Sequence, residues 1–291
     1  MCGIIAAVGQ RDVTEILLEG LRRLEYRGYD SAGVALLNDK GDLQSSKHSG
    51  KVAVLEEALA TLPVMGVTGI AHTRWATHGA PNTVNAHPHI RGNRIALVHN
   101  GIIENHQSLR ESLMSHGVTF ASDTDTEVIV HLINAEMENQ PALLKAVQQV
   151  LPRLEGAYAL AVLDAQTPGL LVVARAGSPL VLGVGMGESY AGSDTLALRP
   201  VTDRFVYLEE GDTAELIAGS YTIYSHDGHV VEREITRLEA SDDNGGLGDY
   251  EHYMLKEIYE QPARLQDTVS IDWRSDDCFG ANTREDRKSV V

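Results

Sequence analysis

Short apolar segments with the character of strands lie near both ends of the sequence, and helical segments lie between them. Residues 2–8 are apolar up to Gly9, while the apolar segments 158–163 and 170–174 are joined by a Thr-Pro-Gly turn. Further strands are expected at 34–37, 69–75, 95–99, 180–182, 205–208, 213–217 and 222–224, and helices at 14–26, 52–62, 108–115, 126–139 and 142–154. We expect an α+β domain in which apolar sheets stack and helices cover them.

The helix expected at 14–26 has a start signal and an apolar face. Thr14 is placed to cap it, and Ile16, Leu17, Leu21 and Leu24 share one face.

Composition narrows the class of protein. The chain has 291 residues and a net charge of -17, which argues against a nucleic-acid partner and against an anionic membrane surface. No apolar run is long enough to cross a bilayer. The start lacks a basic segment followed by an apolar stretch, so we expect no signal peptide. Cys2 and Cys278 lie at opposite ends, so we expect no disulfide framework and a cytoplasmic location.

The C-terminal part differs from the rest in composition. We expect one domain over residues 1–239 and a linker over 240–270, which begins Gly/Asp-rich and has a helical pattern around Pro262. Residues 271–291 are polar, mixed in charge and without periodicity, and we expect a disordered tail there.

Cys2 is a candidate nucleophile. Because Met1 precedes a small residue, its removal would leave one residue holding both a thiol and a free α-amine. An α-amine titrates near pH ~8 and can accept a proton from a nucleophile of its own residue. The alternative is an arbitrary second residue in a buried first strand.

A dense polar run at 72–79 lies in an otherwise apolar neighbourhood. Arg74 can hold a carboxylate through two parallel hydrogen bonds, Thr77 and His78 can add donors, and Trp75 can cover the site. The alternative is a solvated strand end with an ordinary surface arginine.

Asn100-Gly101 follows the strand expected at 95–99 and has two interpretations. Asn-Gly is a common hairpin turn. An Asn amide beside a Gly backbone N–H can also form an oxyanion hole, because both donors can converge on a tetrahedral oxygen.

The acidic segment 122–127 precedes a helical pattern. Thr124 or Asp125 can cap that helix, or a carboxylate there can bind a substrate ammonium. The segment lacks the further ligands that a calcium loop needs.

Cofactor signals are weak. Six histidines lie between His72 and His106, but His-x-His without a cysteine cluster is a poor metal motif, so we expect no metal. No GxGxxG or Walker sequence appears, and no nucleotide cofactor is expected.

Taken together, these segments resemble a known family. The motifs occur in order as MCGI at the start, RLEYRGYDSAG from residue 23, HTRWATHG from 72, NAHPH from 85, HNGIIENH from 99, TDTE from 124, ARAGSPL from 174 and LEEGD from 208. Over residues 1–268 the chain resembles the N-terminal glutaminase half of the glutamine–fructose-6-phosphate aminotransferases. The resemblance implies an N-terminal-nucleophile hydrolase fold, a four-layer αββα sandwich of two antiparallel sheets.

The resemblance also implies catalytic roles. Cys2 is the nucleophile with its α-amine as general base, and Asn100 with the Gly101 N–H forms the oxyanion hole. Glutamine is then hydrolysed through a γ-glutamyl thioester, with release of ammonia and glutamate.

Substrate-binding roles follow from the same resemblance. Arg74 is expected to bind the α-carboxylate of glutamine, with Thr77 and His78 beside it. Asp125 and the Gly101 carbonyl are expected to bind the α-ammonium. Trp75 would lie on a loop that closes over the site, and Arg27 would support the site near Cys2. No cofactor is implied.

In the family, the ammonia converts fructose 6-phosphate into glucosamine 6-phosphate on a second, sugar-binding half. We expect this chain, which stops at Val291, to lack that half, to hydrolyse glutamine alone and to be a monomer. Residues 271–291 resemble nothing in the family and are interpreted as an out-of-frame or foreign tail, or as a short interaction tail. Two alternatives remain: a fragment that only binds glutamine, and an ammonia-donating subunit for a separate synthase.

Overall fold

The computed structural model describes residues 2–238 together with 255, 258, 259 and 261. Met1–Asp242 form one compact unit, and its elements are described here. The expected linker at 240–270 falls almost wholly, and the tail at 271–291 wholly, outside the described residues, so the domain boundaries stay predictions.

The first sheet has eight strands in the order β15-β11-β9-β10-β1-β4-β2-β3, with antiparallel neighbours throughout. Its strands are β1 (Gly3–Val8), β2 (Ser31–Leu37), β3 (Leu43–Ser49), β4 (Thr68–Arg74), β9 (Val181–Val184), β10 (Ser189–Gly192), β11 (Arg204–Tyr207) and β15 (Ile235–Arg237).

The second sheet has seven strands in the order β14-β13-β12-β8-β7-β6-β5 and is also antiparallel. Its strands are β5 (His89–Arg91), β6 (Ile95–Ile103), β7 (Gly156–Asp164), β8 (Leu171–Ala176), β12 (Thr213–Ile217), β13 (Ser220–Tyr224) and β14 (Val230–Val231).

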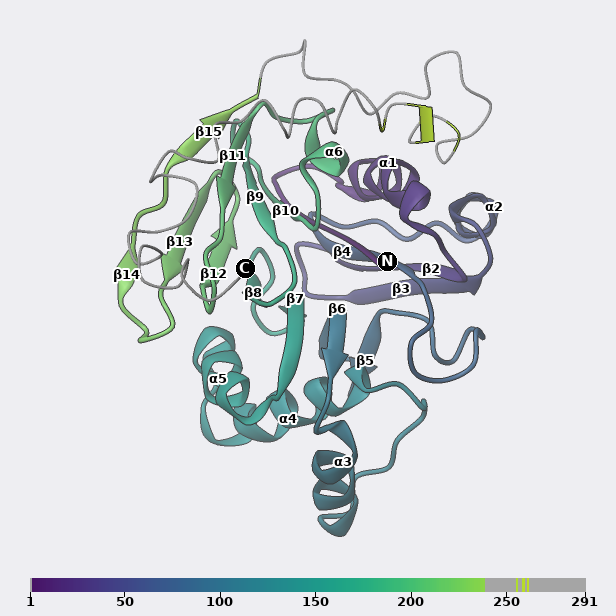
Figure 1. Cartoon of the computed structure of the whole chain (residues 1–291), viewed down its shortest axis with the longest axis vertical. Coiled ribbons are helices and arrows are strands. Elements are labelled where there is room, and N and C mark those ends of the chain that lie inside the picture. Colours follow the sequence, from purple (N-terminus) through teal and green to yellow (C-terminus); the bar gives the residue numbers. More distant parts are fainter. Residues whose placement is uncertain (1, 239–254, 256–257, 260, 262–291) are drawn as a thin grey trace, which may run out of the picture. The chain divides into compact units, whose positions relative to one another are not determined.

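Helices cover the outer faces of the two sheets (Figure 1). Those on the first sheet are α1 (Thr14–Leu24), α2 (Val52–Thr61) and α6 (Thr195–Leu198); those on the second are α3 (His106–Ser115), α4 (Thr126–Asn139) and α5 (Leu143–Val150). The 3-10 turns Glu25–Arg27 and Leu151–Arg153 follow α1 and α5.

The alternation of side chains along β1 explains why this strand is apolar at every position. Ile4, Ala6 and Val8 pack into the core between the sheets. Ile5 and Ala7 point to the opposite face and pack against α1 and α6. Since neither face of β1 meets water, a polar residue on either face would have to be buried. The expected αββα sandwich is confirmed.

Several local expectations were wrong. Thr14 is the first residue of α1 rather than its cap, and its hydroxyl donates to Asp12 Oδ1 at 2.8 Å. The helix expected at 142–154 ends as a 3-10 turn because Pro152 cannot supply a backbone N–H. The strands β3, β5, β10, β14 and β15 were not predicted, since they are short or lack alternation.

No helix in the described part of the chain is both long and apolar enough to span a bilayer.

Candidate active site

The register of the first sheet brings Cys2 to the end of β4. Gly3 pairs with Thr73, so Cys2, just before β1, lies beside Trp75, just after β4. The Trp75 backbone N–H donates to Cys2 Sγ at 3.2 Å, and the thiol lies 3.5 Å from the Trp75 carbonyl. A Cβ on Gly3 would lie 2.8 Å from Cβ of Leu24, so glycine allows α1 to pack at this point.

The second sheet contributes β6, whose residue Asn100 reaches Cys2. Asn100 and Gly101 lie inside β6 and pair with Ala159 and Tyr158 of β7, so the hairpin-turn interpretation was wrong. The Asn100 Nδ2 amide donates to the Cys2 carbonyl oxygen at 3.2 Å. Gly101 has φ 130°, and a side chain there would overlap the Ala157 carbonyl oxygen.

These strand ends surround a pocket of about 550 Å³. Predicted residues in its lining are Cys2, Arg27, Trp75, Thr77, Asn100 and Gly101, and it is completed by Ile102, Glu104, Ala157, Ser178 and Pro179. Sequence reasoning assigned no role to the second group, although most of its members stand in the motifs of the resemblance. The structure therefore places six of the nine predicted site residues around one pocket.

Trp75 contributes an exposed aromatic side chain to the lining of this pocket. It is 54% exposed, and its ring lies against Gly28, where a Cβ would overlap it. Gly28 has φ 98°, so this close approach uses a backbone conformation that favours glycine.

Arg74 lies outside the pocket lining. It is 4% exposed, and its guanidinium donates to the carbonyl of His78 and to those of Gly79 at 3.2 Å and Ala80 at 3.3 Å. Asp30 lies 3.6 Å from it. In this arrangement the guanidinium N–H groups of Arg74, which a carboxylate would need, are hydrogen-bonded to carbonyl groups of the loop after β4.

Asp125 and His78 lie together behind the end of β6. Asp125 is 4% exposed, and its Oδ2 accepts from the Ile103 backbone N–H at 2.9 Å, while His78 Nδ1 lies 3.9 Å from its Oδ1. Asp125 stands at the N-cap position of α4 but makes no side-chain cap bond. Capping by its side chain was therefore wrong, because the carboxylate serves β6.

Arg27 is held at the pocket by an acidic partner. Its Nη2 donates to Asp194 Oδ2 at 2.5 Å, and the Tyr26 hydroxyl donates to the same oxygen at 2.9 Å. These contacts fix a positive charge in the pocket wall.

The surroundings of Cys2 disfavour the thiolate form of its side chain. Burial raises the pKa of Cys2 above its ordinary value, although the Trp75 N–H and the Arg74 charge act in the opposite direction. A thiol of this kind needs a nearby base to become a nucleophile.

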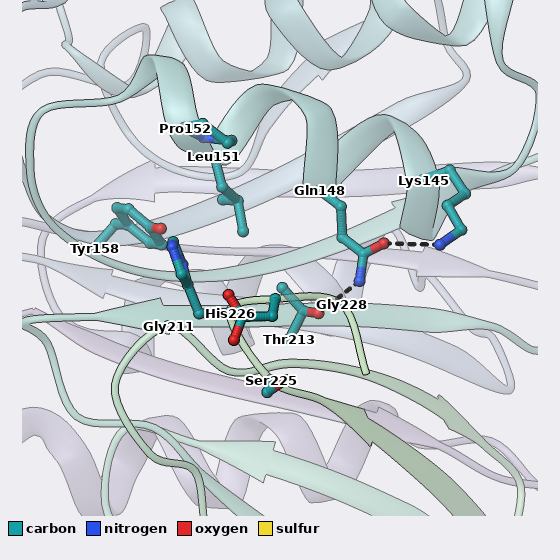
Figure 2. Close-up of a pocket in the computed structure, with 11 residues that line it drawn as sticks. Lys145, Gln148, Leu151, Pro152, Tyr158, Gly211, Thr213, Ser225, His226 and Gly228 are labelled. Carbon is teal, nitrogen blue, oxygen red and sulfur yellow. Dashed lines mark hydrogen bonds between the residues drawn. The ribbon is translucent and has the colours of Figure 1, made fainter. Parts of the chain in front are cut away.

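A second pocket of about 360 Å³ is lined by residues of α5 and the turn after it, by Thr213 of β12 and by residues 225–228, which follow β13 (Figure 2). Among its lining residues, Lys145 donates to Gln148 at 3.2 Å, and Gln148 donates to Thr213 at 3.1 Å. Its lining has no cysteine, whereas Cys2, the candidate nucleophile, lines the first pocket. Among the described residues, no group of three or more His, Cys, Asp or Glu could hold a metal ion.

The comparisons with known proteins agree with this geometry. A family model described as a glutamine amidotransferase domain matches residues 72–200. The glutamine–fructose-6-phosphate aminotransferase of Pseudomonas syringae is 56% identical over 269 residues, covering 92% of this chain and 44% of that relative. That of Shewanella oneidensis is 54% identical over 294 residues, covering 100% of this chain and 48% of the relative. The chain thus spans about half the length of the curated relatives it matches.

Solved structures share the fold. The glutamine phosphoribosylpyrophosphate amidotransferase of Bacillus subtilis is 25% identical with a TM-score of 0.64, over 82% of this chain and 50% of that one. A glutamine aminotransferase class-II domain protein of Silicibacter pomeroyi, 18% identical with a TM-score of 0.51 over 77% of this chain and 99% of its own, shows the fold alone. Together, sequence and fold show that the chain carries a glutamine amidotransferase domain, and that it is similar to about half the length of the glutamine–fructose-6-phosphate aminotransferases.

Proposed function

We propose that this chain hydrolyses L-glutamine with Cys2 as the nucleophile. After removal of Met1, the α-amine of Cys2 takes the thiol proton, and Sγ attacks the side-chain amide carbon of glutamine. The amide nitrogen receives the proton and leaves as ammonia, and a γ-glutamyl thioester remains. Water then cleaves the C–S bond, which gives glutamate and restores the thiol.

The negative oxygen of the tetrahedral intermediate is stabilised by the Asn100 amide and the Gly101 N–H. The observation that carries the proposal is the Asn100 amide, which donates to the Cys2 carbonyl at 3.2 Å at the wall of the same pocket. An oxyanion donor contributes about 3 kcal/mol to lowering the barrier.

We propose that Thr77, Asp125 and Arg74 lie near the α-carboxylate and α-ammonium of bound glutamine. Thr77 lines the pocket. Asp125 accepts a hydrogen bond from the backbone of Ile103, the residue that follows the pocket-lining Ile102 in β6. For Arg74 to hold the α-carboxylate, its guanidinium has to exchange at least one carbonyl of the 78–80 loop for the substrate. We propose that His78 assists there, that Trp75 covers the bound substrate and that Arg27 supports Cys2.

The test is glutamate release from glutamine by the purified chain, with Cys2→Ala as the matched variant and intact mass to establish removal of Met1. Activity that disappears in Cys2→Ala supports the proposal. Activity retained by Cys2→Ala contradicts it. A folded, processed chain that is stabilised by glutamine but releases no glutamate contradicts hydrolysis and supports a glutamine-binding module.

The onward use of ammonia is a further part of the proposal. Relatives carry the name of an aminotransferase acting on fructose 6-phosphate, and this chain spans about half their length. We propose that transfer to fructose 6-phosphate requires a sugar-binding part to be supplied, that the described domain is monomeric and that it works in the cytoplasm. A coupled assay for the amino sugar tests the first statement, light scattering tests the second, and fractionation of cells that express the chain tests the third.

A further inference from the structure

The Asn100 amide can stabilise an oxyanion only in one of its two orientations. Oδ1 accepts and Nδ2 donates, and a flip about the last side-chain bond exchanges them. A flipped amide would present an oxygen to the developing negative charge and would raise the barrier. What fixes this orientation therefore bears directly on the proposed hydrolysis.

His72, on β4, determines the orientation through a chain of donors and acceptors. Its Nε2 lies 3.0 Å from the His99 carbonyl oxygen and 2.9 Å from the Asn100 side-chain oxygen. A backbone carbonyl only accepts, so Nε2 must carry a hydrogen. The Asn100 atom that faces this N–H must then be Oδ1, since an NH₂ group there would oppose two donors.

The other end of the Asn100 amide agrees with this assignment. Nδ2 faces the Cys2 carbonyl at 3.2 Å, which also only accepts. One Nδ2 hydrogen is used there, and the second is left for the pocket that Asn100 lines. Both contacts of the amide therefore select the same orientation.

The imidazole of His72 is itself held in place. It is 1% exposed, and its ring stacks on that of His87 with centroids 4.1 Å apart. Burial lowers the pKa of His72 to about 3, so the ring is neutral and carries one hydrogen at neutral pH. Its Nδ1 has no hydrogen-bond partner among the described residues, as expected when the hydrogen is on Nε2.

We propose that His72 is a positioning residue for glutamine hydrolysis, which holds the Asn100 amide so that an Nδ2 hydrogen faces the reacting carbonyl oxygen. The inference rests on the proposed function of the Cys2 pocket. His72 is not among the residues that line the Cys2 pocket. Its effect should therefore appear in turnover rather than in glutamine binding.

The first experiment compares His72→Phe and His72→Gln with the unchanged chain in steady-state glutaminase assays. Phe keeps a ring for stacking but cannot donate, so we expect kcat to fall about 10- to 100-fold with KM changed less than about two-fold. Gln can place an amide N–H near the position of Nε2 and should recover part of the loss. His131→Phe is the matched control, because His131 is also buried and hydrogen-bonded, at 3.3 Å to Glu127, but lies on α4. It should leave kcat per folded molecule unchanged.

A double-mutant cycle tests whether His72 acts through Asn100. In an Asn100→Ala background, His72→Phe should cost little further activity, because the amide it orients is gone. A full second loss in that background would overturn the inference, as would an unchanged kcat in folded His72→Phe.

A measurement without turnover keeps the inference testable if the chain alone is inactive or His72→Phe does not fold. Long-range ¹H–¹⁵N NMR of the unchanged chain should find His72 neutral at pH 7, with Nε2 protonated and Nδ1 not. A proton on Nδ1 would overturn the inference whatever the activity. Absence of glutamate release with the expected tautomer would instead count against the proposed function.

Discussion

The backbone N–H of Trp75 donates to Cys2 Sγ at 3.2 Å, so the end of β4 positions the thiol at the start of β1. The contact joins residues 73 positions apart and is fixed by the pairing of Gly3 with Thr73. It partly offsets the burial that raises the pKa of Cys2. The thiol of the proposed nucleophile is thus oriented by sheet register, and its raised pKa means that its activation would require a base.

The two N-terminal forms of the chain should differ in thiol reactivity. With Met1 retained, the raised pKa of Cys2 predicts that iodoacetamide alkylation still accelerates as the pH rises past about 9. With Met1 removed, the α-ammonium of the same residue should shift this profile to lower pH. Peptide mass mapping separates Cys2 from Cys278. Identical profiles for the two forms would contradict a role for the α-amine.

Gly101→Ala should abolish glutaminase activity and destabilise the domain. Its φ of 130° and the overlap of a Cβ with the Ala157 carbonyl oxygen require β6 to move away from β7. Gly92→Ala is the control, because Gly92 has φ 61° but no neighbour within 4 Å of a Cβ. That control should cost only about 1 kcal/mol. Urea unfolding and activity on both variants decide the matter, and equal stability would be inconsistent with the crowding at Gly101.

Arg74→Lys should weaken glutamine binding more than it slows turnover. Lysine keeps the charge but loses the planar fork that holds the carbonyls of Gly79 and Ala80 and that is proposed to receive the α-carboxylate. We expect KM to rise about 10- to 100-fold, measured by initial rates of glutamate release. An unchanged KM would remove Arg74 from the proposed substrate contacts.

The stability of the domain should fall steeply in mild acid. Burial lowers the pKa of His72 and His89 to about 3 and that of His87 well below its ordinary value. Because the unfolded chain binds protons at these histidines near pH ~6.5 and the folded chain does not, this stability is present above pH ~6.5 and is lost as the pH falls toward about 3. The unfolding free energy should then change with pH by a slope that approaches about 4 kcal/mol per pH unit below pH ~6.

Urea unfolding at pH 7.5, 6.5 and 5.5 checks this dependence. His89→Phe should reduce the slope of the unfolding free energy against pH by about the contribution of one titrating histidine. Equal unfolding free energies at pH 7.5 and 5.5 would show that these histidines titrate normally in the folded chain.

Glu127→Gln should destabilise the start of α4. Burial opposes the charge of Glu127, but hydrogen bonds from His131 and from the backbone of Ala121 and Ser122 outweigh it and lower its pKa to about 2. This stability is therefore present above pH ~4.5 and is lost as the pH falls to about 2. At pH 7 the Gln amide places donors against donors, at a cost of about 2 to 3 kcal/mol in urea unfolding. Glu136→Gln, on the same helix with a half-exposed partner in Arg153, should cost less than about 0.5 kcal/mol.

The order of strands and helices could be predicted because periodicity and turn residues are local signals. The fully apolar residues 2–8 indicated a strand of stacked sheets, and β1 is buried on both faces. Short strands such as β10 and β14 escaped prediction, since two to four residues leave too little pattern to detect. Segment 122–127 was also ambiguous, because the sequence pattern of a carboxylate before a helix is the same whether the carboxylate caps the helix or binds a substrate ammonium.

By itself, the sequence determined the chemistry available: a cysteine at position 2, an Asn-Gly pair, a polar run around Arg74, and motifs in the order of one family. Only the tertiary structure decided which of these residues meet. Asn100 and Gly101 form part of a strand rather than a turn because β7 pairs with them, and this pairing places the Asn100 amide against Cys2. Sheet register between segments far apart in the chain is a non-local property, and so is the hydrogen bond of His72 that orients Asn100.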